Sequence, residues 1–259
     1  MPQIIREFFQ NELADYLEVP NVKVVNSGTS ALVATLASLN LKGDEVITTP
    51  FTFYTAVNAI VLAGGDPVFV DVKLENSLMN EDLIEAAIND STAAIIVTHL
   101  FGRACNMDVI MAIADKYGIV VIEDVAQSFG VDFKDKKLGT WGDAGCYSFY
   151  KTKNFSTFEG GAIVAKDDSK IDFSKVCGIA DPIESKGRHI GYNFRMSELC
   201  ALIGYEKLKL HRDSITSEIG RYSEQDGYYP KLVYELPAYE EYYGCCPVAE
   251  SIARDIIGG

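Results

Sequence analysis

Residues 145–161 read GCYSFYKTKNFSTFEGG, a short aromatic strand and turn that runs into a Glu-Gly-Gly loop. Ser148 and Lys153 lie five residues apart in this stretch. A lysine attacks an aldehyde only as the neutral amine, which requires partial burial or a second cation nearby. Lys151 is either such a cation or a solvated surface charge. Because most lysines are exposed, the stretch alone leaves open whether Lys153 is a nucleophile or a surface group.

Strand-like and helix-like segments alternate in the part of the chain that precedes this stretch. We predict strands at 22–25, 44–50, 67–72, 93–97 and 119–122, and helices at 3–17, 31–39, 51–62, 80–88 and 107–117. Such alternation predicts an α/β protein with a mostly parallel sheet and helices on both faces. Ligands of these sheets gather at the carboxyl ends of the strands. Asp124 follows the strand at 119–122 and is therefore well placed for a ligand site.

The turn Asn26-Ser27-Gly28-Thr29-Ser30 leads from the first predicted strand into an apolar helix. Free backbone N–H groups and hydroxyls at the start of a helix form a ready anion site. Serine and threonine also cap helices that bind nothing. The turn alone is therefore either a phosphate site or an ordinary helix cap.

Composition limits the class of protein. A chain of 259 residues with 48% hydrophobic residues has room for one large α/β domain, alone or with a small appendage. A formal net charge of −14 and the absence of Lys/Arg clusters argue against a nucleic-acid partner. The six cysteines contain no Cys-x-x-Cys pair, which favours reduced thiols in a cytoplasm over disulfides or a metal site. We expect neither a signal peptide nor a membrane span.

Six motifs occur in the order seen in the DegT/DnrJ/EryC1/StrS family, and together they cover most of residues 10–210. They are SGTSAL at 27–32, GDEVIT at 43–48, HLFG at 99–102, IEDVAQS at 122–128, GDAGCYSFYKTKN at 142–154 and GYNFRMSE at 191–198. The family resembles aspartate aminotransferase in fold (pyridoxal-phosphate-dependent transferase fold type I) and mostly makes amino sugars. The resemblance implies the same fold here, with pyridoxal 5'-phosphate (PLP) as cofactor.

The resemblance assigns the reacting groups. Lys153 would form a Schiff base with PLP, and Asp124 would face the pyridinium nitrogen. A carboxylate there keeps the ring nitrogen protonated, so that the ring can take up electrons when the α-proton of the substrate leaves. Gln127 would lie near the phenolic oxygen of the ring. On the residues alone, the alternative for Asp124 is a cap of the helix that follows.

The resemblance also assigns binding residues. Phe53 matches the aromatic position that stacks on the cofactor ring, although a core position is the alternative because aromatic residues are usually buried. Gly28, Thr29 and Ser148 match phosphate contacts. Asn193 resembles the residue that reaches the phosphate across a dimer interface, or else it only orders its own loop. The resemblance thus implies a homodimer with shared active sites.

Three other residues are not assigned to the cofactor site. We interpret His99 as a hydrogen-bonded structural histidine and Arg195 as a structural ion-pair partner. Phe158 stands where similar proteins often have a glycine, which leaves the shape of its loop open.

The expected reaction transfers an amino group, with glutamate as the expected donor, to a nucleotide-linked keto sugar. The sugar nucleotide comes from the resemblance alone. One alternative is a PLP-dependent sugar dehydratase of the same fold, but those relatives typically carry histidine at the position of Lys153. A second alternative is a catalytically silent sensor or scaffold that retains the fold.

The carboxyl-terminal part departs from the family, whose members are about a hundred residues longer. We expect a large PLP-binding domain at 1–210 and a truncated or incomplete small domain at 211–259. A predicted helix at 197–222 runs almost directly into Tyr228-Tyr229-Pro230, so a block of sequence is expected to be missing near 223–227. Residues 247–250 resemble a segment close to the end of the relatives.

Overall fold

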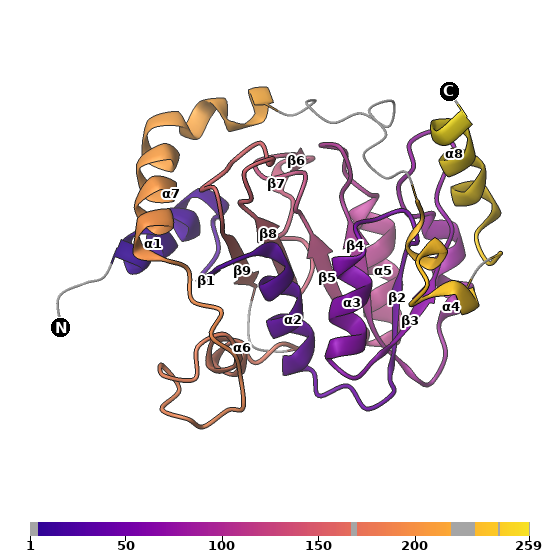
Figure 1. Ribbon diagram of the computed structural model, residues 1–259, viewed down its shortest axis with the longest axis horizontal. Coiled ribbons are helices and arrows are strands. Elements are labelled where there is room, and N and C mark those ends of the chain that lie inside the picture. Colours follow the sequence, from indigo (N-terminus) through magenta and orange to yellow (C-terminus); the bar gives the residue numbers. More distant parts are fainter. Residues whose placement is uncertain (1–4, 167–169, 219–230, 243, 259) are drawn as a thin grey trace.

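The computed structural model describes residues 5–166, 170–218, 231–242 and 244–258. Its centre is a seven-stranded sheet in the order β1-β9-β8-β5-β4-β2-β3 (Figure 1). The strands are β1 Asn21–Val25, β2 Glu45–Thr48, β3 Asp66–Phe69, β4 Thr92–Thr98, β5 Val120–Asp124, β8 Ala144–Ser148 and β9 Gly161–Ala165. The strand β9 pairs antiparallel with both β1 and β8, and all other pairings in this sheet are parallel. The predicted mostly parallel sheet is confirmed.

Helices cover both faces of the sheet, as predicted (Figure 1). The longer helices are α1 Ile5–Leu17, α2 Gly28–Ser38, α3 Thr55–Leu62, α5 Met107–Tyr117, α6 Phe173–Ala180, α7 Glu198–His211 and α8 Pro247–Gly258. Shorter elements are η1 Glu81–Leu83, α4 Ile84–Ala87, β6 Asp132–Phe133, β7 Lys136–Lys137, η2 Arg212–Glu218, η4 Val233–Glu235 and η5 Glu240–Tyr242.

The interior strand β4 shows how the two faces are filled. Successive side chains of a strand point to opposite faces. Ala94 and Ile96 lie in the hydrophobic cluster that contains α2, α3 and α6, while Ile95 and Val97 lie in the cluster that contains α5. A third cluster joins α1 and α7 to β1, β8 and β9. These strands are apolar on both sides because both faces are covered.

Three predicted helices are shorter than expected. The helix predicted at 51–62 begins only at Thr55, as α3. Residues 80–88 form only η1 and α4, because Ile88 is already extended and the Asn89 side chain accepts the N–H of Ser91 in a polar turn. The helix predicted at 197–222 ends as α7 at His211 and continues as η2. The remainder of that prediction, and the expected join at 223–230, lie outside the described residues.

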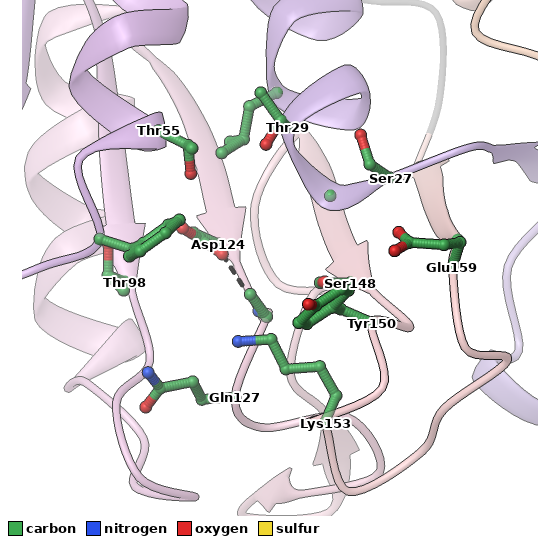
Figure 2. Close-up of a pocket in the computed structure, with 15 residues that line it drawn as sticks. Ser27, Thr29, Thr55, Thr98, Asp124, Gln127, Ser148, Tyr150, Lys153 and Glu159 are labelled. Carbon is green, nitrogen blue, oxygen red and sulfur yellow. Dashed lines mark hydrogen bonds between the residues drawn. The ribbon is translucent and has the colours of Figure 1, made fainter. Parts of the chain in front are cut away.

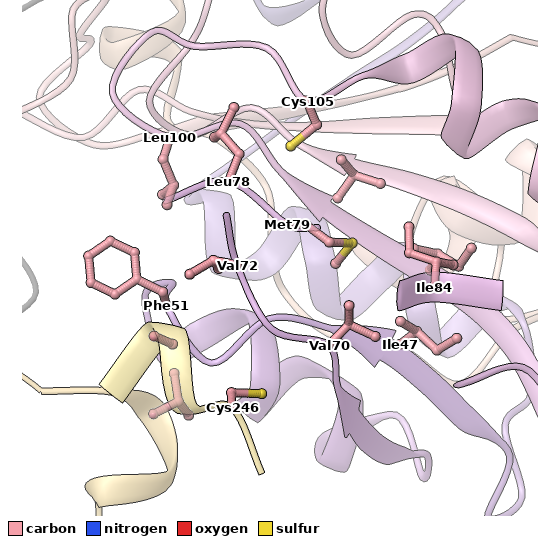
Figure 3. Packing of buried hydrophobic residues seen from close by; sticks show 14 of the residues in the cluster. Ile47, Phe51, Val70, Val72, Leu78, Met79, Ile84, Leu100, Cys105 and Cys246 are labelled. Atoms are coloured by element: carbon pink, nitrogen blue, oxygen red, sulfur yellow. The ribbon is translucent and has the colours of Figure 1, made fainter. Parts of the chain in front are cut away.

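The described carboxyl-terminal segments pack on the large sheet. Leu232, Tyr234 and Cys246 belong to the same hydrophobic cluster as Ile47 (Figure 3). The Asp71 carboxylate, which follows β3, accepts the first-turn N–H groups of Val248 (2.8 Å) and Ala249 (2.9 Å) in α8. The division into domains at residue 210 stays a prediction. Among the described residues, none of the helices has the length and apolar character that a membrane crossing demands.

Candidate active site

A cavity of about 360 Å³ opens at the carboxyl ends of the parallel strands (Figure 2). Thr98, Asp124 and Ser148 are the last residues of β4, β5 and β8, and all three line it. The lining residues are Ser27, Gly28, Thr29, Leu32, Phe53, Thr55, Thr98, Asp124, Ala126, Gln127, Ser148, Tyr150, Lys153, Glu159 and Gly160. Every residue predicted for the site lies in this set except Asn193.

The start of α2 and the end of β8 meet on one side of the cavity, where together they could act as an anion cradle. Ser27 caps α2, its hydroxyl accepting the N–H of Ser30 at 3.1 Å. The N–H groups of Gly28 and Thr29, at the first two positions of the helix, have no carbonyl one turn earlier to which they can donate. A Cβ on Gly28 would lie 2.7 Å from the Cβ of Ser148. Only glycine lets the helix approach so closely, which brings the Ser148 hydroxyl beside the helix start.

Asp124 supplies a buried carboxylate, only 6% exposed. Burial raises the pKa of this carboxyl above its ordinary value, although the N–H of Ala126 at 3.0 Å and the charge of Lys153 act to lower it. An ionised carboxylate in such a place is stabilised by a cation held against it. The protonated nitrogen of a pyridine ring is a cation of that kind.

Gln127 presents a hydrogen-bond donor to the cavity. Its Oε1 accepts the backbone N–H of Phe101 at 2.9 Å. A backbone N–H can only donate, so the oxygen of the amide must lie on that side and the nitrogen on the other. Figure 2 shows the amide nitrogen on the side that faces Lys153. A ligand atom at this place is therefore expected to be an acceptor.

Lys153 enters the cavity from the loop that follows β8. The turn is closed by its own backbone N–H, which donates to the carbonyl of Tyr150 at 2.9 Å, and the next residue, Asn154, donates from its side chain to Phe129 O at 2.8 Å. In Figure 2 the amino group of Lys153 lies between Asp124 and Gln127. Lys151 is exposed, with its amino group 5.7 Å from the centre of the Tyr150 ring, and does not line the cavity.

Phe53 lines the cavity, whereas Asn193 does not. The Phe53 ring is 44% exposed and lines the cavity, whereas Phe51 takes the core position at 1%. The alternative of a core position for Phe53 is therefore wrong. Asn193 is exposed, and its carbonyl accepts the side-chain N–H of Asn26 at 3.5 Å. Its role at a subunit interface stays a prediction.

His99 and Arg195 both have structural hydrogen-bond partners, and Phe158 has a left-handed backbone conformation. His99 is fully buried and hydrogen-bonded, and Arg195 donates to Asp181 Oδ1 at 2.8 Å, both as expected. Phe158 has φ +69°, a left-handed conformation that glycine adopts freely. The loop thus keeps a glycine-like backbone although the residue is phenylalanine.

Sequence reasoning missed several lining residues, among them Thr55, Thr98, Tyr150 and Glu159. One signal for Thr98 was available, because it directly follows the parallel strand predicted at 93–97. Its hydroxyl lies 3.3 Å from that of Thr52. Tyr150 and Glu159 lie in the stretch at 145–161, but their orientation depends on turns that the sequence does not specify.

Comparison with known proteins agrees with this geometry. The profile of the DegT/DnrJ/EryC1/StrS aminotransferase family matches residues 5–223. The chain is 40% identical over 208 residues to dTDP-4-amino-4,6-dideoxy-D-glucose transaminase of Shigella dysenteriae, a match that covers 79% of this chain and 56% of that protein. For eight curated relatives, the match covers between 52% and 63% of the relative's length, little more than half.

Solved structures share the fold. A DegT DnrJ EryC1 StrS aminotransferase from Brucella abortus matches with TM-score 0.84 and 25% identity, covering 100% of this chain and 90% of that one. A GDP-4-keto-6-deoxymannose-3-dehydratase with a trapped PLP-glutamate geminal diamine matches with TM-score 0.73 and 26% identity, covering 80% of this chain and 61% of that one. The aspartate aminotransferase-like fold is confirmed. The chain belongs to the DegT/DnrJ/EryC1/StrS aminotransferase family.

Proposed function

We propose that the chain is a PLP-dependent aminotransferase that moves an amino group, with glutamate as donor, onto a nucleotide-linked keto sugar. The observation that carries the proposal is the convergence of three groups on one cavity. These are the amine of Lys153, the buried carboxylate of Asp124 and the anion cradle of α2 and Ser148. A flat cofactor with a phosphate, an aldehyde and a pyridine nitrogen needs contacts of these three kinds.

The residues fit PLP in chemistry and in placement. The missing Cβ of Gly28 permits the close contact of α2 with Ser148, so that the N–H groups of the helix start and the Ser148 hydroxyl can reach the same phosphate. Asp124 lies at the end of β5, where burial makes its ionised form depend on a partner cation. When bound, PLP supplies an aldehyde that captures an amine and a protonated ring that withdraws electrons from the carbon losing a proton.

Each residue then has a definite task. The amine of Lys153 would hold the aldehyde carbon of PLP and, when free, would act as the base and acid that moves a proton at the substrate carbon. Asp124 keeps the ring nitrogen protonated. Gln127 donates to the phenolic oxygen, and Phe53 covers one face of the ring. The α2 and Ser148 cradle fixes the phosphate.

The substrates are proposed from the relatives. One relative is named for an amino sugar carried on dTDP, and one solved relative holds glutamate joined to PLP. The latter is a dehydratase, and its resemblance supports dehydration as the second candidate reaction. Lys153 favours amino transfer, because the lysine amine that both halves of that reaction require is present in the cavity.

We also propose a homodimer in which Asn193 of a second copy completes each phosphate site. The exposure of Asn193 and its place outside the cavity of its own chain support this arrangement. A cytoplasmic location is proposed because the six cysteines of the sequence contain no Cys-x-x-Cys pair, which favours reduced thiols.

The first experiment adds PLP to the purified protein. We expect a visible absorbance band that Lys153→Ala abolishes and that the matched variant Lys151→Ala keeps, because Lys151 lies outside the cavity. A wild-type protein without the band would contradict the proposed enzyme. A panel of nucleotide-linked keto sugars with glutamate, followed by release of 2-oxoglutarate, then tests the substrate class, and no turnover with any of them would contradict it.

A further inference from the structure

His99 lies directly after β4 and is fully buried. Its Nε2 is 3.0 Å from Glu123 Oε2, and the backbone N–H of Cys105 donates to its Nδ1 at 3.2 Å. Because Nδ1 accepts a hydrogen bond from a group that can only donate, it carries no proton. The ring is therefore neutral, with its proton on Nε2 directed to Glu123.

Glu123 is a fixed anchor for that ring. Its carboxylate is fully buried and accepts three backbone N–H groups, from Gly139, Trp141 and Gly142, each at 2.8 Å. Together with His99 Nε2, these donors satisfy both oxygens. A buried carboxylate bonded in this way keeps one position, and so does the imidazole that donates to it.

The backbone of His99 holds the turn that carries the site residues. Its N–H donates to the carbonyl of Asp124 at 3.0 Å, and its carbonyl accepts the hydroxyl of Ser128 at 2.9 Å. Both ends of the turn 124–128 are thus bonded to one residue. Asp124 and Gln127, which line the cavity, both lie in that turn.

The loop that begins at His99 also sets the amide of Gln127. Phe101 has φ +55°, a strained conformation for a residue other than glycine. In this conformation its N–H donates to Gln127 Oε1 at 2.9 Å. On the outer side, the Arg103 guanidinium lies 5.5 Å from the centre of the Phe101 ring and donates to Asn76 O at 2.9 Å. At the end of the loop, the backbone N–H of Cys105 donates to the His99 ring.

We propose that His99, anchored by Glu123, is a positioning residue that fixes the loop 99–105 and thereby holds the Gln127 amide with its donor facing the cavity. His99 touches no ligand in this account. It acts through the Phe101 N–H and through the bonded turn 124–128. The identity of the acceptor, the phenolic oxygen of PLP, rests on the proposed function, whereas the positioning itself does not.

The first test uses the protein without cofactor. His99→Asn keeps an acceptor for the Cys105 N–H but loses the donor to Glu123, while His99→Gln can still donate to Glu123. We expect His99→Asn to speed hydrogen exchange at the amides of residues 101 and 126–128 by about tenfold or more, and His99→Gln to restore much of the protection. Ser38→Ala is a matched control, because it removes a buried side-chain hydrogen bond elsewhere, that of the Ser38 hydroxyl in α2. It should leave the exchange of these amides unchanged.

The second test adds PLP and titrates its visible band with pH. A donor to the phenolic oxygen stabilises the ionised oxygen and lowers the pH at which the band titrates. Gln127→Ala is expected to raise that midpoint by about one unit, as for an ordinary hydrogen bond to a charged group. His99→Asn should also raise the midpoint. The double variant His99→Asn/Gln127→Ala should have the same midpoint as Gln127→Ala alone.

The outcomes separate the two proposals. Unchanged exchange at 101 and 126–128 in His99→Asn, or a midpoint shift that adds fully to that of Gln127→Ala, overturns the positioning role. A wild-type protein that shows no visible band overturns the proposed function, and the exchange experiment then still decides the positioning role.

Discussion

Replacing Gly28 by alanine puts a methyl group into the contact between α2 and β8. The new Cβ would lie 2.7 Å from Ser148 Cβ and 3.3 Å from Ser148 Cα. Carbon atoms pack best at about 3.5–4.0 Å, so the helix start must move by roughly 1 Å. Overpacking of this kind costs about 1–3 kcal/mol. The better helix propensity of alanine offsets up to about 1 kcal/mol of that.

The net loss should therefore be about 1–2 kcal/mol, which lowers the Tm by about 2–4 °C in a chain of this size. Cofactor affinity should fall at least about tenfold, equivalent to about 1.4 kcal/mol, because the helix N–H groups and the Ser148 hydroxyl no longer converge. Calorimetry without cofactor and a PLP titration followed by absorbance measure the two effects separately.

Ser148→Gly provides the matched comparison, since it removes Cβ, the atom nearest to the new methyl group, together with Oγ. The double variant Gly28→Ala/Ser148→Gly should be as stable as Ser148→Gly alone, while PLP binding stays weak because the hydroxyl is gone. If Gly28→Ala alone melts and binds PLP like the wild type, close contact with Ser148 does not shape the cradle.

Phe158→Gly should stabilise the protein by about 0.5–1 kcal/mol, because glycine relieves the left-handed backbone and the lost ring is largely exposed; a lower Tm would contradict this. Asp71→Ala should cost about 1–2 kcal/mol and speed hydrogen exchange at the start of α8, whereas unchanged exchange there would exclude the cap. Burial raises the pKa of Cys146 to about 12, so mass spectrometry after alkylation at pH 8 should find Cys146 among the last thiols to react and the exposed Cys245 among the first. Asp124→Asn should raise the Tm of the cofactor-free protein at pH 7 and weaken PLP binding. The gain should vanish below about pH 4, where Asp124 is protonated in both states, because a pKa raised by folding makes ionisation costly only above that range.

The order of elements along the sheet was predictable as far as local pattern determines it. Alternating apolar strands and helices predicted the parallel strands β2 to β5, whereas β8 was expected only as a short aromatic strand in the stretch 145–161. The antiparallel placement of β9 between β1 and β8 depends on pairing between distant segments, which no local pattern reports. The helix predicted at 80–88 failed because the periodicity of a short apolar segment does not reveal the polar turn at Asn89 that ends it.

The site was predictable where a motif ties a residue to a strand end. Asp124 and Ser148 end strands, and Gly28 begins a helix, so their place followed from the fold. Thr55 and Tyr150 reach the cavity through the packing of one segment on another, and the sequence carried no signal for them. Lys153 could be assigned to the site only from the whole set of motifs, because a lysine in a turn has no burial pattern of its own.

Glu123 and Asp124 are consecutive carboxylates at the end of β5, and they point to opposite sides of the strand. Both are buried, at 0% and 6% exposure. Three backbone N–H groups and His99 donate to Glu123, so both of its oxygens are satisfied within the protein itself. Asp124 accepts the Ala126 N–H, and burial still raises its pKa. A carboxylate in that state gains most from a cation that arrives with a ligand, which is why we assign the structural task to Glu123 and the cofactor to Asp124.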